Sequence, residues 1–123
     1  MDVPVYDLNG VCVLELAGKD QQLRNDHDAL DAIAAASAHS AELVVIPVPH
    51  LAEDFFRLKT RVAGEIIQKF VTYRVRLVIL GDISNYLQDS SALQDFVYEC
   101  NEGPHVWFVN DMDELRRRLL ERL

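Results

Sequence analysis

The chain has 123 residues, half of them hydrophobic, and a formal net charge of −8 at pH 7. This length predicts one domain, residues 1–123, with a hydrophobic core of its own, and the hydrophobic content argues against intrinsic disorder. The acidic balance argues against nucleic acid as the main partner, because phosphate binding needs a basic face. Basic residues are denser within 57–76 and 116–122, where solvated helix faces explain them more simply than a basic patch.

The two cysteines, Cys12 and Cys100, lie in apolar settings and show none of the CxxC or Cys/His spacings that hold zinc. The simplest interpretation is that both cysteines are buried free thiols in a reducing cytosol. The N-terminus does not read as a signal peptide, and no apolar run reaches the length of a membrane span. We therefore expect a soluble, cytoplasmic protein with no membrane association, no metal site and no cofactor.

The first predicted element is a β-hairpin within residues 1–17. Strands at 3–8 and 11–17 flank Asn9-Gly10, and Asn-Gly is the strongest short-range signal for a two-residue hairpin turn. Pro4 has no backbone N–H to donate to a neighbouring strand, so the first strand is expected at a sheet edge.

A helix is predicted after the polar loop at 18–25. Asp26 or Asp28 is expected to cap it, and it runs to about His39. Its expected inner face comprises Leu30, Ile33 and Ala34. The short β-branched run at 43–46 shows no alternation, which is typical of a strand covered on both faces.

The longest predicted helix covers residues 54–73 and is strongly amphipathic. At about 100° per residue its apolar side chains fall within roughly half of the helical circumference. They are Phe55, Phe56, Leu58, Val62, Ala63, Ile66, Ile67, Phe70 and Tyr73. Glu65 and Lys69 lie at the border of this arc, four residues apart, where an ion pair can form. Lys59 falls inside the arc, so either the regular helix begins after it or its amine is held against the core.

Gly64 lies inside this predicted helix, where glycine costs roughly 1 kcal/mol relative to alanine. Close approach of another backbone is the first explanation that we expect, and a bound ligand is the second.

The remaining chain alternates strands and helices. A strand at 75–80 is followed by a loop at 81–89 and by a helix with Ser91 as N-cap and Gln94 completing a capping box. A strand at 105–109 and a final helix capped by Asn110 complete the chain. Continuous apolar strands that alternate with helices predict right-handed crossovers. The predicted fold class is α/β: a small mixed, mostly parallel sheet with helices on both faces and an N-terminal β-hairpin.

In such a sheet the functional crevice lies at the carboxyl ends of the strands. The loops expected there bring together polar side chains, namely His50, Asp54, Asp82, Ser84, Asn85, Tyr86 and Asp111. Asp54 and Asp82 could bind a cation with His50 nearby, or Ser84 could act as a nucleophile or a phosphorylation site. Alternatively, Asp82 and Ser84 stabilise their own turn and Asp54 caps the following helix.

Several familiar chemistries have no motif in the chain. The five glycines are isolated, so no dinucleotide-binding fingerprint or phosphate loop can be built. There is no GxSxG elbow and no HExxH. The four histidines are scattered without ligand spacing, and His105, at the start of an apolar strand, is interpreted as a structural histidine.

Three segments carry a family resemblance: DFFRLKTRVAGEIIQKF at 54–70, YRVRLVILGDIS at 73–84 and SSALQDFVYECNEG at 90–103. In this order they closely resemble the family of domain of unknown function 4180, most strongly over the family core at 54–109. Arg61 departs from the glycine of the family pattern. The resemblance names a group and implies no particular reaction. The motif positions include Asp54, Phe55, Phe56, Leu58, Lys59, Thr60, Ala63, Gly64, Glu65, Gln68, Lys69, Phe70, Tyr73, Arg74, Gly81, Asp82, Ser84, Asp95, Phe96, Tyr98, Glu99 and Asn101.

A shorter similarity concerns residues 89–93. The sequence DSSAL resembles the D-S-S-G-L start of a helix in STAS (anti-sigma-factor antagonist) domains, which share a small α/β build and act by binding partners. Ordinary helix-capping chemistry explains these five residues equally well.

Our leading hypothesis is a non-enzymatic regulatory module that binds a protein partner or another copy of itself. Its surface is the polar face of the 54–73 helix with the 81–89 loop, and the candidate residues are Asp54, Lys59, Thr60, Glu65, Gln68, Lys69, Asp82 and Ser84. The alternative is a small enzyme or ligand sensor, with Asp54, Lys59, Asp82 and Ser84 around a polar pocket at the carboxyl ends of the strands.

Overall fold

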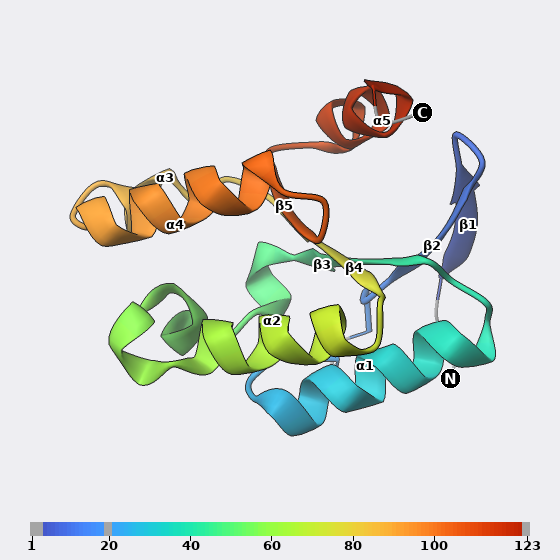
Figure 1. The fold of residues 1–123 in the computed structure, drawn as a ribbon, viewed down its shortest axis with the longest axis horizontal. Helices are drawn as coiled ribbons and strands as arrows, with labels where there is room; N and C mark the ends of the chain where they lie inside the picture. The colour runs from blue at the N-terminus through green and yellow to red at the C-terminus, as the bar shows by residue number, and fades with distance from the viewer. Residues whose placement is uncertain (1–3, 19–20, 122–123) are drawn as a thin grey trace.

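Within the residues that the structure describes, five strands form one mixed sheet in the order β1-β2-β3-β4-β5 (Figure 1). The computed structural model describes residues 4–18 and 21–121. β1 pairs antiparallel with β2, and all later neighbours pair in parallel. The strands are β1 (Val5–Leu8), β2 (Val11–Glu15), β3 (Leu43–Pro47), β4 (Arg76–Leu80) and β5 (Val106–Val109). The predicted α/β fold with a mostly parallel sheet is confirmed.

The N-terminal hairpin turns at the predicted dipeptide. Asn9 has φ +51° and Gly10 has φ +86°, and two positive φ values in a two-residue turn match the right-handed twist of the flanking strands. β1 is an edge strand, as Pro4 predicts, and the Pro4 carbonyl accepts a hydrogen bond from the Glu15 N–H at 2.9 Å.

The helices are α1 (Asp26–Ala38), α2 (Val62–Thr72), the single turn α3 (Ser84–Leu87), α4 (Ser91–Glu102) and α5 (Met112–Glu121). Right-handed crossovers between strands in sequential order place α1, α2 and α4 on the same face of the sheet. α5 follows the last strand and lies on the other face, near the β1–β2 hairpin (Figure 1). There the Asn9 Nδ2 donates a hydrogen bond to the Arg116 carbonyl at 3.0 Å.

Alternate strand residues enter two separate cores. Val44, Ile46, Leu77 and Ile79 join the larger core under α1, α2 and α4. Their neighbours Leu43, Val45 and Val78 join the smaller core, with Leu115 and Leu119 of α5. Because both faces of β3 and β4 are covered, these strands are apolar without alternation, as predicted.

The predicted helix over residues 54–73 is wrong in its first third. Residues 53–60 form two 3₁₀ turns, η2 (Glu53–Phe56) and η3 (Leu58–Thr60), and the regular helix α2 begins only at Val62. The Thr60 hydroxyl lies 2.7 Å from the carbonyl oxygens of Asp54 and Arg57, and the Val62 N–H donates to it. This side chain competes with helical backbone bonding and closes the turn.

Arg61 separates the two turns from α2 in a left-handed conformation, with φ +65°. Glycine adopts this conformation without the steric cost that a Cβ brings, which gives a physical reason for the glycine of the family pattern at this position. Lys59 is exposed before the break, so the regular helix does begin after it.

The predicted helix caps are displaced by one to three residues. Asn25 caps α1, since its side-chain oxygen accepts the Asp28 N–H at 2.9 Å. The Ser90 hydroxyl accepts the Leu93 N–H of α4 at 3.1 Å, and an Asp111 carboxylate oxygen accepts the Glu114 N–H of α5 at 2.9 Å. The predicted caps Asp26 or Asp28, Ser91 and Asn110 are therefore wrong.

The inner face of α1 also differs from the prediction. Ile33 is buried together with Ala29, Ala32 and Ala36, whereas Leu30 is half-buried and Ala34 is exposed. The three buried alanines keep the helix close to the sheet that it covers.

Candidate functional site

The polar side of α2 is open to solvent. Gly64, Glu65, Gln68 and Thr72 are exposed, while Ala63, Ile66 and Phe70 are buried beneath them. Gln68 donates a hydrogen bond to the Thr72 hydroxyl at 3.2 Å, along the helix surface. The amphipathic pattern thus anchors α2 to the sheet and leaves its polar side accessible.

The two edges of α2 have different neighbours. α2 packs against α1 on one side, and Ile67 and Val71 line a groove toward α4 on the other. Glu65 and Lys69 project from the edge away from the groove, because they are offset by two residues from Ile67. No ion pair joins them among the ion pairs of the described residues.

Gly64 has no steric partner within the described chain. A Cβ built on it would meet nothing within 4 Å, so the expected close approach of another backbone segment is wrong. Gly64 is the third residue of α2 and lies on the groove edge, three residues before Ile67.

Two polar loops meet at the carboxyl ends of β3 and β4. The Phe56 ring of η2 stacks on the Tyr86 ring of α3, with centroids 4.1 Å apart and planes inclined by 11°. This contact brings the segment of Asp54, Lys59 and Thr60 near the turn of Asp82 and Ser84. The 81–89 segment is therefore not a plain loop, since it contains α3.

The acidic side chains of these loops are engaged locally. An Asp82 carboxylate oxygen accepts the Ser84 backbone N–H at 2.9 Å, and this bond, with help from the Ser84 hydroxyl, holds the pKa of Asp82 below its usual value. A carboxylate oxygen of Asp54 lies 3.5 Å from the Arg57 guanidinium. Asp82 thus stabilises its own turn, as the alternative interpretation expects, and Asp54 does not cap α2.

The other predicted rim residues are tied to different elements. The His50 Nδ1 lies 2.9 Å from the Gln21 carbonyl oxygen, and Asp111 caps α5. Asp54, Lys59, Asp82 and Ser84 are not among the lining residues of four well-formed cavities in residues 4–18 and 21–121. Each is exposed.

Asn101, a position marked by the family resemblance, joins three elements. Its side-chain oxygen accepts the Phe108 N–H of β5 at 2.7 Å, and its carbonyl accepts a hydrogen bond from the Arg118 guanidinium of α5. That guanidinium lies 4.5 Å from the centre of the Trp107 ring, a cation–π contact. Asn101 therefore ties α4 to β5 and α5, which is a structural role.

Both cysteines are free and half-buried. Burial, with a smaller contribution from the Glu99 carboxylate, raises the pKa of the Cys100 thiol to about 11. A thiol in this state is a weak nucleophile at neutral pH.

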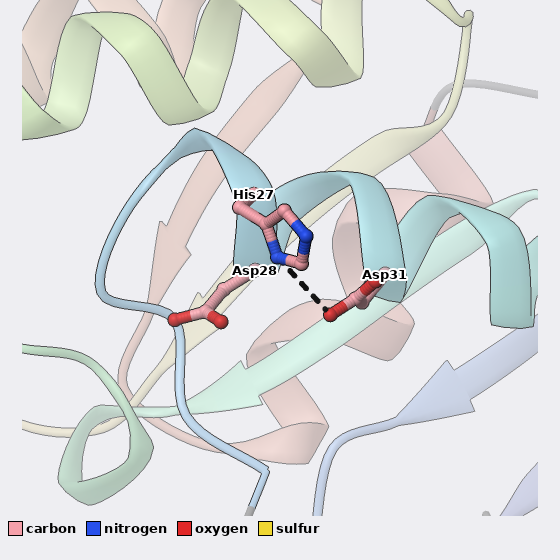
Figure 2. A group of neighbouring side chains, drawn as sticks. All are labelled: His27, Asp28 and Asp31. Atoms are coloured by element: carbon pink, nitrogen blue, oxygen red, sulfur yellow. Dashed lines mark ion pairs between the residues drawn. The ribbon is translucent and has the colours of Figure 1, made fainter.

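Within the described residues, the structure brings together a group of potential metal ligands that the sequence pattern did not predict. His27, Asp28 and Asp31 at the start of α1 have ligand atoms within 4.8 Å of one another (Figure 2). Their spacing of one and four residues on a helix is the signal that could have found them. The Asp28 carboxylate, however, accepts hydrogen bonds from the Arg24 guanidinium and backbone N–H, and His27 pairs with Asp31 at 3.6 Å. Because the carboxylate of Asp28 is already engaged, we assign no metal to this group.

Among residues 4–18 and 21–121, no helix has both the length and the apolar content needed to cross a membrane. Comparison with curated proteins and comparison with solved structures both found no significant match. Residues 8–119 match the family described as Domain of unknown function (DUF4180). The match extends the resemblance from the 54–109 core to nearly the whole chain, and the chain belongs to this family.

Proposed function

We propose that this domain is a non-enzymatic regulatory module of the cytoplasm that binds a protein partner or a second copy of itself. The binding surface is the exposed side of η2, η3 and α2 together with the 81–89 segment, which contacts η2 through the stacked rings of Phe56 and Tyr86. It includes the residues named from the sequence: Asp54, Lys59, Thr60, Glu65, Gln68, Lys69, Asp82 and Ser84.

Gly64 is the observation that carries the proposal. Glycine weakens a helix by about 0.5–1 kcal/mol relative to alanine, and here no neighbouring atom lies within 4 Å of the position that a Cβ would take. A group from another molecule that approaches α2 closely provides a reason for the missing side chain. The polar side chains around Gly64 would then set the specificity of that contact.

The enzyme alternative lacks such an observation. It needs Asp54, Lys59, Asp82 and Ser84 around one polar pocket, whereas the structure shows Asp54 beside Arg57 and Asp82 bonded to its own turn. The STAS-like similarity at 89–93 stays a prediction, and the Ser90 hydroxyl in that segment serves as the N-cap of α4.

The test is charge exchange on the open side of α2. The tagged double variant Glu65→Lys/Lys69→Glu keeps the net charge, and we expect it to lose partners that co-purify with the unaltered domain from the native host. Asp113→Arg/Arg116→Asp is the matched control, because it exchanges an exposed pair on α5, on the other face of the sheet. An unchanged set of partners together with an unchanged oligomeric state in the α2 variant would refute the proposal.

A further inference from the structure

A cavity of about 700 Å³ lies at the amino ends of the parallel strands, at the edge of the sheet opposite to the 81–89 segment. Its walls come from the segments that enter β3, β4 and β5 (Figure 1). Small-molecule sites in proteins span about 300–1,000 Å³, so the cavity has room for a ligand of that class. The polar and charged side chains that line it are Ser37, Glu42, Tyr73, Arg74, Arg76 and His105.

Two guanidinium groups and an imidazole share this cavity. Arg76 is the first residue of β4. The register that pairs Leu77 with Val106 places Arg76 beside His105 at the start of β5, and neighbouring positions of this kind direct their side chains to the same face of a sheet. Arg74 reaches the cavity from the turn between α2 and β4.

The lining of the cavity carries an excess of positive charge. Neither Arg74 nor Arg76 belongs to an ion pair formed within residues 4–18 and 21–121. The carboxylate of Glu42, which also lines the cavity, accepts the Cys12 backbone N–H at 3.4 Å. The two guanidinium groups thus outweigh this carboxylate, although the chain as a whole has a formal net charge of −8.

Arg74 occupies a backbone position that favours glycine. It follows the C-cap of α2 with φ +59°, and glycine is the usual residue at a left-handed position after a helix. The Arg74 and Val75 N–H groups donate to carbonyls of the last turn of α2, at 3.2 and 3.0 Å, so the backbone alone satisfies this helix end. The turn therefore needs no arginine side chain, and a strained residue beside a cavity is typical of a ligand-binding position.

We propose that this cavity binds a small dianionic molecule, a phosphate monoester or a dicarboxylate, between Arg74 and Arg76. Guanidinium groups recognise both kinds of anion through paired N–H donors, and the His105 imidazole supplies a further donor. The Tyr73 ring, 56% exposed, lines the same cavity and offers an apolar surface to the carbon skeleton of the ligand. This inference goes beyond the proposed function, because the site lies away from the 81–89 segment and needs no protein partner.

Heteronuclear NMR titration of the full chain tests the proposal, at constant ionic strength because salt screens charge pairs. The probes are glycerol phosphate, succinate and, as the neutral control, glycerol. We expect one or both anions to cause saturable shifts of the backbone amides around the cavity and of the Trp107 indole N–H, since the Arg76 guanidinium lies 6.0 Å from the centre of that ring. The anion that responds identifies the recognised group. No saturable shift with either anion, or shifts centred on another part of the chain, would overturn the inference.

Arg74→Gly separates binding from folding. Glycine relieves the positive φ, so Tm should rise, whereas the affinity for the anion should fall about tenfold with the loss of a charge-assisted pair. Arg76→Gln should weaken binding to a similar extent. Arg117→Gln is the matched control, because it removes the charge of an exposed arginine of α5 that does not line the cavity. Unchanged affinity in both cavity variants, or an equal loss in the control, would show unspecific attraction between charges and would refute the site.

Discussion

Replacing Gly64 by alanine should make the domain more stable, although glycine is the residue of the family pattern. Gly64 is the third residue of the 11-residue helix α2, and an added Cβ would meet nothing within 4 Å. The added methyl group therefore causes no clash. The preference of a helix for alanine over glycine, about 0.5–1 kcal/mol, should then appear as a gain in the free energy of unfolding. For a domain of this size the gain corresponds to a rise of roughly 2–6 °C in Tm.

Urea denaturation followed by circular dichroism measures this change, at low protein concentration, because association between copies would itself stabilise the folded state. The slope of the unfolding free energy against urea should stay constant. Ala34→Gly at an exposed position of α1 is the matched control and should lose a similar amount. If Gly64→Ala proved destabilising, Gly64 would be needed for the fold of the isolated chain, and the argument that it serves a partner would be refuted.

Three further predictions concern single side chains. Arg61→Gly should raise the unfolding free energy by about 1 kcal/mol, because glycine removes the Cβ strain at φ +65°; a loss in urea denaturation would contradict this. The Arg24 guanidinium lowers the pKa of the Asp28 carboxyl in the folded state below its ordinary value of 3.8. The stability that Asp28 contributes is therefore fully present above pH 3.8 and is lost as the pH falls through the lower pKa of the folded state. Asp28→Asn should therefore be less stable than the unaltered protein at pH 7 and should match it in strong acid; a gap that persists there would exclude this pairing as the cause. The pKa of Cys100, raised from 9.0 to about 11, leaves about 100-fold less thiolate at neutral pH, whereas the more basic thiolate is about tenfold more nucleophilic. Mass spectrometry should therefore find alkylation of Cys100 by iodoacetamide about tenfold slower than that of a cysteine peptide; equal rates would show that the thiol is not shielded.

The proposed contacts of α2 lie on the face of the sheet that α1, α2 and α4 cover. The other face is closed by α5, whose Arg118 guanidinium bonds the Asn101 carbonyl and covers the Trp107 ring. Family-motif residues therefore divide into two kinds. Asn101 holds the fold together, whereas a Cβ on Gly64 would meet nothing within 4 Å and the Glu65 carboxylate takes part in no ion pair of the described residues.

Local chemistry was sufficient to predict several elements. The hairpin follows from Asn9-Gly10, because both residues tolerate the positive φ values that the turn requires. The apolar runs of β3 and β4 follow from their burial on both faces. The break before α2 was missed, because the Thr60 hydroxyl competes for backbone groups and periodicity does not register such competition.

By itself, the sequence determined the succession of strands and helices along the chain, the buried stripe of α2 and the family, because these depend on residue types at short spacing. Only the tertiary structure decided what surrounds α2. Sequential strand order sends α1, α2 and α4 to one face, which turns Glu65 and Lys69 away from α4 and opens the groove lined by Ile67 and Val71. Contacts of this kind join residues far apart in the chain, and no local pattern contains them.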